Sequence, residues 1–109
     1  MIYVSGRVDI KNLDHYKAQF QSAKEYLLHD VWVYEDNIVT TLTEIYEEYA
    51  KDAPLGELST IEEIEARIAM AKNCTRLYLL QGWEVDDMCR MEHTIAKAYG
   101  VSITYSKKF

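Results

Sequence analysis

The chain has 109 residues, 49% of them hydrophobic and 28% charged, with a formal net charge of −6. This length fits a single domain over residues 1–109, and the composition is typical of a globular rather than a disordered protein. Because the chain is negative and its basic pair is Lys107-Lys108, we expect no nucleic-acid partner. The sequence shows no signal peptide and no membrane-spanning run, which predicts a cytoplasmic protein without a membrane partner.

The cysteines and histidines do not form a metal-binding pattern. Cys74 and Cys89 lie far apart and form no CxxC pair, so we expect them to be small buried residues. His15, His29 and His93 also lack metal-ligand spacing. We therefore expect neither a metal nor a cofactor.

The first third of the chain predicts a strand, a helix and a second strand. Residues Ile2–Ser5 form a β-type run that ends at Gly6. An amphipathic helix is expected from about Asn12 to His29, and a second strand over Val31–Tyr34, followed by the polar loop Glu35-Asp36-Asn37. The apolar stripe of the helix is Leu13, Tyr16, Phe20, Ala23 and Leu27.

Two capping-box signals, in which a hydroxyl residue precedes a Glu by three positions, predict the starts of two further helices. These helices are expected over residues 41–52 and 60–73, separated by a break at Pro54. The capping pairs are Thr41 with Glu44 and Ser59 with Glu62, and the second helix carries the stripe Ile61, Ile64 and Ile68.

The last third of the chain predicts a strand, a helix and a strand. Arg76–Leu80 is nearly continuous in apolar residues, which is typical of a strand buried on both faces. A helix over Val85–Tyr99 is closed by Gly100, and Val101–Tyr105 forms the last strand. Strands that alternate with helices indicate an α/β fold with a parallel, doubly wound sheet of about four to five strands.

In such sheets, ligands bind beyond the carboxyl ends of the strands. The ends of the predicted strands therefore indicate three candidate ligand-binding segments. They are Ser5-Gly6-Arg7, Glu35-Asp36-Asn37 and Gly82-Trp83-Glu84.

Glu92 is a charged residue within the apolar face of the last predicted helix. A carboxylate in such a position is costly unless it is paired or protonated, and such costs are often tolerated at functional sites. Two structural alternatives remain open: an interior ion pair, for example with Arg76 or Arg7, and a half-exposed helix edge. The other residues of this face are Val85, Met88, Cys89, Ile95, Ala96 and Tyr99.

Asp86 and Asp87 lie in the first turn of the same helix. Their ordinary role there is to cap the helix and compensate its dipole. The functional alternative is that Asp86 orients a ligand hydroxyl or assists Glu92.

Several short motifs resemble the nucleoside 2-deoxyribosyltransferase superfamily, and a small phage and bacterial branch of it in particular. The resemblance implies a flavodoxin-like (Rossmann-like) fold, and cleavage or exchange of the N-glycosidic bond of a nucleoside or nucleotide. The motifs are Ile2-Tyr3-Val4-Ser5-Gly6, Leu79-Leu80-Gln81-Gly82-Trp83-Glu84, Glu92, Ala96 and Gly100.

By this resemblance Glu92 is the nucleophile that attacks the sugar carbon C1′, where a carboxylate can stabilise or trap an oxocarbenium-like centre. Tyr3 would position that nucleophile, and Asp86 would favour an unphosphorylated 5′-hydroxyl over a phosphate. The resemblance also implies a homo-oligomer. The expected substrate-binding residues are Ser5, Gly6, Arg7, Gly82, Trp83, Asp86 and Met88.

The sequence departs from the family pattern at four places. Arg7 replaces a Pro, Met88 replaces a Gly, Glu35-Asp36 replaces Asn-Pro, and Ala66 stands where the transferases carry an Asp. The Met88 replacement and the missing Asp at Ala66 favour an alternative in which the same crevice binds a nucleotide, or a signal derived from one, without cleaving it.

Overall fold

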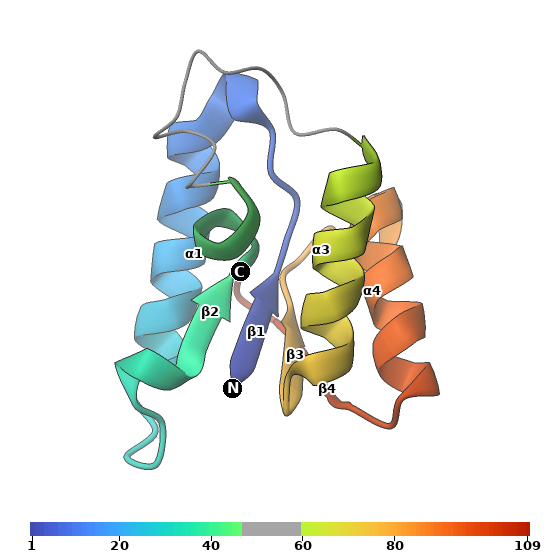
Figure 1. The fold of residues 1–109 in the computed structure, drawn as a ribbon. Coiled ribbons are helices and arrows are strands. Elements are labelled where there is room, and N and C mark those ends of the chain that lie inside the picture. The colour runs from blue at the N-terminus through green and yellow to red at the C-terminus, as the bar shows by residue number, and fades with distance from the viewer. Residues whose placement is uncertain (47–59) are drawn as a thin grey trace.

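The structure is a computed structural model that describes residues 1–46 and 60–109. It is an α/β fold with a four-stranded, all-parallel sheet flanked by helices, as the sequence predicts for a flavodoxin-like protein (Figure 1). The strands are β1 (Ile2–Ser5), β2 (Ile38–Thr40), β3 (Arg76–Leu79) and β4 (Ser102–Tyr105). The α-helices of the described residues are α1 (Leu13–Leu27), α3 (Thr60–Asn73) and α4 (Asp87–Ala98).

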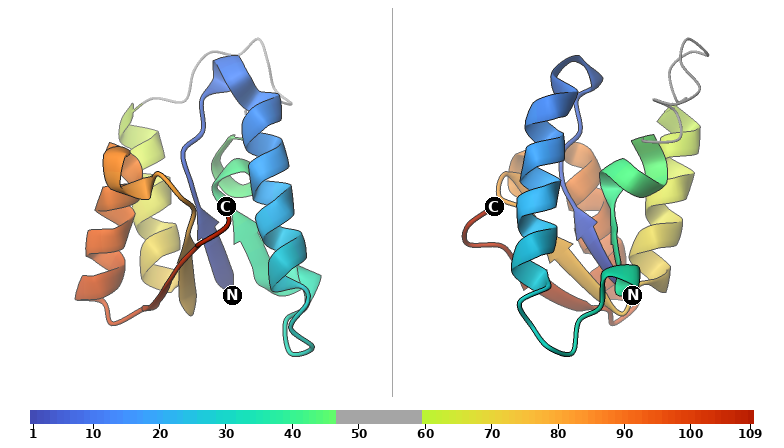
Figure 2. Two further views of the ribbon diagram at one scale, coloured as in Figure 1. Left: turned by 180° about the vertical axis from the view of Figure 1, so that it is seen from behind. Right: turned by 90° about the vertical axis from the view of Figure 1, so that its left-hand side faces the viewer.

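The sheet has the order β2-β1-β3-β4 and carries helices on both faces, with α1 on one and α3 and α4 on the other (Figure 2). Because successive side chains of a strand point to opposite faces, β1 contributes to two cores. Ile2 and Val4 pack with Phe20 of α1, whereas Tyr3 packs with Ala96 of α4. The side chains of alternate β1 residues therefore reach the layer formed by α3 and α4.

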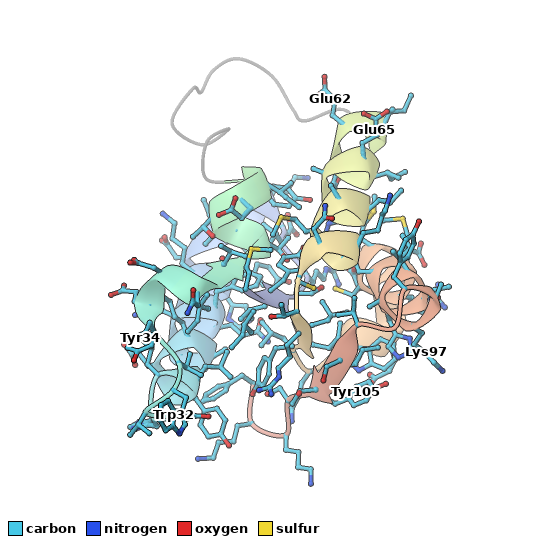
Figure 3. The ribbon with its side chains drawn as sticks, turned by 60° about the horizontal axis from the view of Figure 1, so that its bottom comes forward. Trp32, Tyr34, Glu62, Glu65, Lys97 and Tyr105 are labelled. Carbon is cyan, nitrogen blue, oxygen red and sulfur yellow. The ribbon has the colours of Figure 1, made fainter. Side chains whose placement is uncertain are left out.

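The second strand does not lie where the sequence predicts it. Val31 and Trp32 form a turn and the next two residues belong to no strand. Trp32 and Tyr34 project from this loop after α1 with 81% and 63% of their surface exposed (Figure 3). The strand is instead Ile38–Thr40, whose two end residues are buried. The polar segment Glu35–Asn37 forms the short helix η2 before this strand, so it lies away from the carboxyl edge where ligands bind.

The helix predicted over residues 41–52 begins as a π-helix, η3 (Leu42–Tyr46), and its remainder lies outside the described residues, as do Pro54 and Ser59. The bounds of α3 agree with the prediction. Its buried face, however, is not the predicted stripe that begins at Ile61. Ile61 is 70% exposed, whereas Arg67 is 1% exposed and Ala71 is fully buried. The inner face of α3 therefore carries a charge.

The last helix begins two residues later than predicted, because Trp83–Val85 forms the short helix η4. Val85 precedes α4, and Tyr99 follows its last residue, Ala98. These two side chains are 82% and 61% exposed, so they are not part of the buried face of the helix. That face consists of Cys89, Glu92 and Ala96. Gly100 closes the helix with a φ of 70°, as expected for a left-handed C-terminal residue.

Gly6 follows β1 at a point where side chains approach from two directions. A Cβ atom there would lie 2.8 Å from Leu80 Cδ1 and 3.1 Å from Phe20 Cζ. Contacts this short require the neighbouring side chains to shift, so this position needs the small size of glycine.

Gly6→Ala is therefore expected to lower the free energy of unfolding by about 1–3 kcal/mol, the usual cost of overfilling a packed core. Chemical denaturation followed by far-UV circular dichroism measures this change. Ser102→Ala, at an exposed strand position, is the control and should stay within about 0.5 kcal/mol of the wild type. Equal midpoints for Gly6→Ala and the wild type would contradict the packing argument.

Candidate functional site

The candidate site lies where the strand order of the sheet reverses. The chain adds β2 on one side of β1, and β3 and then β4 on the other, so the reversal falls between β1 and β3. Parallel sheets bind ligands at the carboxyl ends of the strands at such a point. Ser5 ends β1 there, in register with Leu79 of β3, and Glu92 reaches the same place from α4.

Glu92 is fully buried, and its two carboxylate oxygens have different surroundings. Oε1 accepts a hydrogen bond from Ser5 Oγ at 2.7 Å and a second one from Arg67 Nη1 at 2.6 Å. Oε2 is buried and has no hydrogen-bond partner. A buried oxygen without a partner is rare in native proteins, so packing alone does not explain this carboxylate.

Arg67 joins three parts of the fold. Its Nη1 contacts Glu92 on α4, its Nη2 donates to the backbone oxygen of Gly6 at 3.4 Å, and its Nε lies 3.4 Å from Glu63 Oε1. The interior ion pair considered from the sequence is therefore present, but with another partner. Arg7 and Arg76, the partners considered there, are both exposed.

Burial and ion pairing have opposite effects on the pKa values of Glu92 and Arg67. Burial raises the pKa of Glu92 above its ordinary value, and the Arg67 guanidinium, with hydrogen bonding, pulls that pKa part of the way back. Burial works against the Arg67 charge, but the facing Glu92 carboxylate holds the pKa of Arg67 above its ordinary value. Each charge thus depends on the other, because neither contacts bulk water.

Tyr3 and Thr41 form the neighbouring part of the site. The Tyr3 hydroxyl lies 3.0 Å from Thr41 Oγ1, which also accepts a hydrogen bond from the Gly6 amide at 3.3 Å. Burial, together with the charge of Glu92, raises the pKa of Tyr3 well above its ordinary value, so the phenol stays protonated. Thr41 follows β2 directly and thereby connects that strand end to the site.

The structure brings four of the predicted site residues together, namely Tyr3, Ser5, Gly6 and Glu92. Three others lie at the periphery. Arg7 and Gly82 are exposed, and Met88 is half-buried in the first turns of α4.

Asp86 and Trp83 have structural partners of their own. Asp86 caps α4 by accepting a hydrogen bond from the Cys89 amide at 3.0 Å, which is the ordinary role considered for it. Trp83 stacks on His93 with ring centroids 4.4 Å apart, and His93 Nε2 lies 2.8 Å from the Tyr105 hydroxyl. Trp83 therefore belongs to an aromatic group beside β4.

Sequence reasoning missed Arg67 and Thr41, although each gave a signal. Arg67 falls three residues after Ile64 and four before Ala71, so it interrupts an apolar stripe as Glu92 does. Two opposite charges, each inside an apolar helix face, are candidates for a buried pair. Thr41 follows the β-branched run Ile38–Thr40, which is short enough to be overlooked as a strand.

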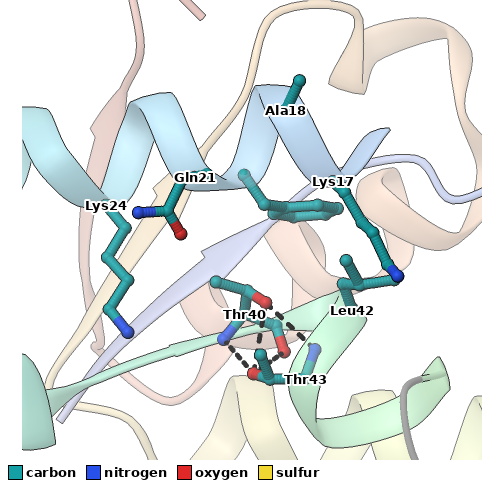
Figure 4. A pocket seen from close by; sticks show the side chains of 8 residues that line it. Lys17, Ala18, Gln21, Lys24, Thr40, Leu42 and Thr43 are labelled. Carbon is teal, nitrogen blue, oxygen red and sulfur yellow. Dashed lines mark hydrogen bonds between the residues drawn. The ribbon is translucent and has the colours of Figure 1, made fainter. Parts of the chain in front are cut away.

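A separate cavity of about 460 Å³ lies on the opposite face of the sheet, between α1 and the end of β2 (Figure 4). Thr40 and Thr43 hydrogen-bond to each other across its floor. Within residues 1–46 and 60–109, Glu92 lines neither this cavity nor two others that these residues form. The cavity is lined by Lys17, Ala18, Phe20, Gln21, Lys24, Thr40, Leu42 and Thr43.

Among residues 1–46 and 60–109, no group of three or more His, Cys, Asp or Glu side chains is arranged to hold a metal ion. No helix within these two ranges is long and apolar enough to cross a membrane.

Comparison with known proteins assigns the chain to a family. It belongs to the family described as a domain of unknown function (DUF4406), whose family model matches residues 1–105. Neither the curated proteins nor the solved structures contain a significant match to this sequence. The match covers all the residues of the site, from Tyr3 to Glu92.

Arg67→Met is expected to lower the free energy of unfolding by about 3–5 kcal/mol near neutral pH, because it leaves Glu92 buried without a counter-charge. Without Arg67 the pKa of Glu92 rises further in the folded state. A raised pKa means that the folded state binds the proton more tightly, so stability is lost as the pH rises through that pKa. The deficit should thus be smaller at about pH 5 than at about pH 8, as denaturation curves at the two values can measure. A stability loss of Arg67→Met that grows toward low pH would contradict the role of Arg67 as the counter-charge of Glu92.

The double variant Arg67→Met with Glu92→Met is expected to unfold within about 2 kcal/mol of the wild type or at higher stability, since two apolar side chains replace the buried pair. The sum of the two single losses should greatly exceed the loss in the double variant. The same denaturation curves give this coupling energy. Additive losses would mean that the two side chains do not stabilise each other.

Proposed function

We propose that this protein is a cytoplasmic N-glycosidase or deoxyribosyltransferase-like enzyme that acts on a nucleoside or nucleotide through Glu92. The observation that carries the proposal is the buried carboxylate at the end of β1, with one oxygen bound and the other without a partner. A carboxylate is the group that stabilises or traps an oxocarbenium-like sugar. The sequence resemblance assigns the nucleophile to the same residue.

In the proposed reaction an oxygen of Glu92 attacks C1′ of the sugar. The C1′–N bond breaks, and its electron pair leaves with the base nitrogen, which takes up a proton from water. The product is a glycosyl ester of Glu92. Attack of water on C1′ then releases the free sugar and regenerates the carboxylate, whereas attack of a second base gives a new nucleoside.

The neighbouring side chains suit this chemistry in different ways. Tyr3 stays protonated beside the carboxylate, and Ser5 donates to it. The substrate would lie toward Gly6 and the start of α4. Because Glu92 is fully buried, a neighbouring side chain has to move before a sugar reaches it.

A non-catalytic nucleotide-binding module is the second candidate, and one observation favours it. The Arg67 guanidinium lies directly on the Glu92 carboxylate at 2.6 Å, and a strong ion pair of this kind weakens a nucleophile. In this reading the same crevice holds the ligand, and no bond is broken. The two candidates differ in whether free base appears.

We also propose that the protein forms homo-oligomers. Trp32 and Tyr34 are large side chains that are 81% and 63% exposed in one loop, and Tyr105 is 49% exposed beside β4. Exposed aromatic residues of this kind are enriched at protein interfaces.

Glu92→Gln is expected to lower the release of free base from a panel of 2′-deoxynucleosides and their 5′-monophosphates by about 10³-fold or more, as for the loss of a nucleophile. The substitution keeps the size of the side chain and removes its charge. Chromatography of the released base measures the rate. Glu65→Gln, on the exposed side of α3 (Figure 3), is the matched control and should keep full activity.

Two outcomes count against the enzyme. Undiminished base release by Glu92→Gln shows that Glu92 is not the nucleophile. No release by the wild type from any member of the panel, together with a thermal shift produced by one of them, favours the binding module instead, since a ligand that binds only the folded state stabilises it.

A further inference from the structure

The two carboxylate oxygens of Glu92 differ in the hydrogen bonds that they accept. Oε1 accepts hydrogen bonds from Ser5 and Arg67, the second of them charge-assisted. Such bonds concentrate negative charge on the oxygen that accepts them and make it a weaker nucleophile. Oε2 makes no direct hydrogen bond, although the Tyr3 hydroxyl is close enough to help lower the pKa of Glu92, so Oε2 is the less engaged of the two oxygens.

We propose that Arg67 is the positioning residue of this site: it fixes Oε1 of Glu92 and leaves Oε2 as the oxygen that attacks C1′. This inference rests on the proposed glycosidase or transferase function. It adds a residue that the sequence resemblance does not assign, and it names the reacting atom.

The surroundings of Arg67 suit a positioning role better than those of Ser5. The guanidinium is 1% exposed and forms hydrogen bonds through Nη1 to Glu92 and through Nη2 to the Gly6 carbonyl. Its Nε lies 3.4 Å from Glu63 Oε1 in an ion pair but makes no hydrogen bond. The two Nη contacts of the planar guanidinium fix the direction of the N–H group that Glu92 accepts. The serine hydroxyl can rotate about its Cβ–Oγ bond, and it also lies 3.6 Å from Cys89 Sγ.

Arg67 is the only cation among the titratable groups that bear on Glu92 in the described part of the chain. From β1, Tyr3 is neutral because its pKa is raised well above the ordinary value. Burial also raises the pKa of Cys74, which follows α3, and raises that of Cys89 in α4 to about 12, so both thiols are neutral. The Tyr46 hydroxyl of η3 donates to Glu63 of α3. The remaining charged neighbour, Glu63, is an anion on the far side of Arg67. Ionisation of Glu92 therefore depends on Arg67.

The first test needs no substrate. Carbon-13 NMR of the glutamate side-chain carboxyls gives the titration midpoint of Glu92, assigned by comparison with Glu92→Gln. Arg67→Met should raise this midpoint by about one unit or more, and Arg67→Lys should change it less, because lysine retains the charge. Arg90→Met, at an exposed position of α4, is the matched control and should leave the midpoint unchanged. Circular dichroism tests whether each variant is folded, and if Arg67→Met is not, the comparison of Arg67→Lys with the wild type decides the role of Arg67.

The second test uses base release. In Arg67→Met the acid limb of the kcat/KM profile should move to higher pH, by the same amount as the NMR midpoint. Arg67→Lys should move the acid limb less than Arg67→Met and keep the wild-type KM while its kcat falls by about 10–100-fold, because the charge remains but the fixed direction is lost. A residue with a merely structural role would lower the folded fraction and leave the pH profile unchanged.

The outcomes separate this inference from the proposed function. Equal Glu92 midpoints in folded Arg67→Met and wild type would overturn the role of Arg67, whatever the activity. Full kcat in Arg67→Lys would overturn the directional part of that role. If Arg67→Met shifts the midpoint while the wild type releases no base, the proposed reaction fails, and with it the assignment of Oε2 as the attacking atom. Control of Glu92 ionisation by Arg67 then stands.

Discussion

The guanidinium of Arg67 and the carboxylate of Glu92 meet 2.6 Å apart in the interior of the protein, where neither charge contacts water. Removing two charges from water costs several kcal/mol for each, and their attraction offsets this cost only with good geometry and further hydrogen bonds. Ser5 and the Gly6 carbonyl supply such bonds. The packing of α3 and α4 over the end of β1 thus depends on this pair, and a purely apolar layer would serve stability at least as well.

The desolvation cost of this buried pair suggests that it has a functional role. The carboxylate oxygen that lacks a hydrogen-bond partner supports the same interpretation. Natural proteins depart from local rules of burial mainly at functional sites, and here the departure coincides with the reversal of strand order at which parallel sheets bind ligands. A glycine at position 6 lets the chain pass close to Phe20 and Leu80 as it leaves β1.

Much of this arrangement could be predicted from sequence patterns, because burial there follows a regular period. Ile2–Ser5 and Thr60–Asn73 lie where the patterns predict them, and Glu92 was singled out because it interrupts an apolar face. The run Val31–Tyr34 does not form the predicted strand, since β-branched and aromatic residues suit both a strand and an exposed aromatic loop. Arg67 was missed because arginine on a helix usually faces solvent, and only the fold shows that the inner face of α3 meets a carboxylate.

The most direct test of the central claim is to trap the glycosyl ester. A 2′-fluoro-substituted deoxynucleoside slows the second step of such reactions, because fluorine destabilises the oxocarbenium-like centre. Peptide mass spectrometry of protein incubated with this compound should then locate a covalent sugar on Glu92, and the adduct should be absent in Glu92→Gln. Release of base with the sugar on another residue, or with no adduct at all, would contradict the account.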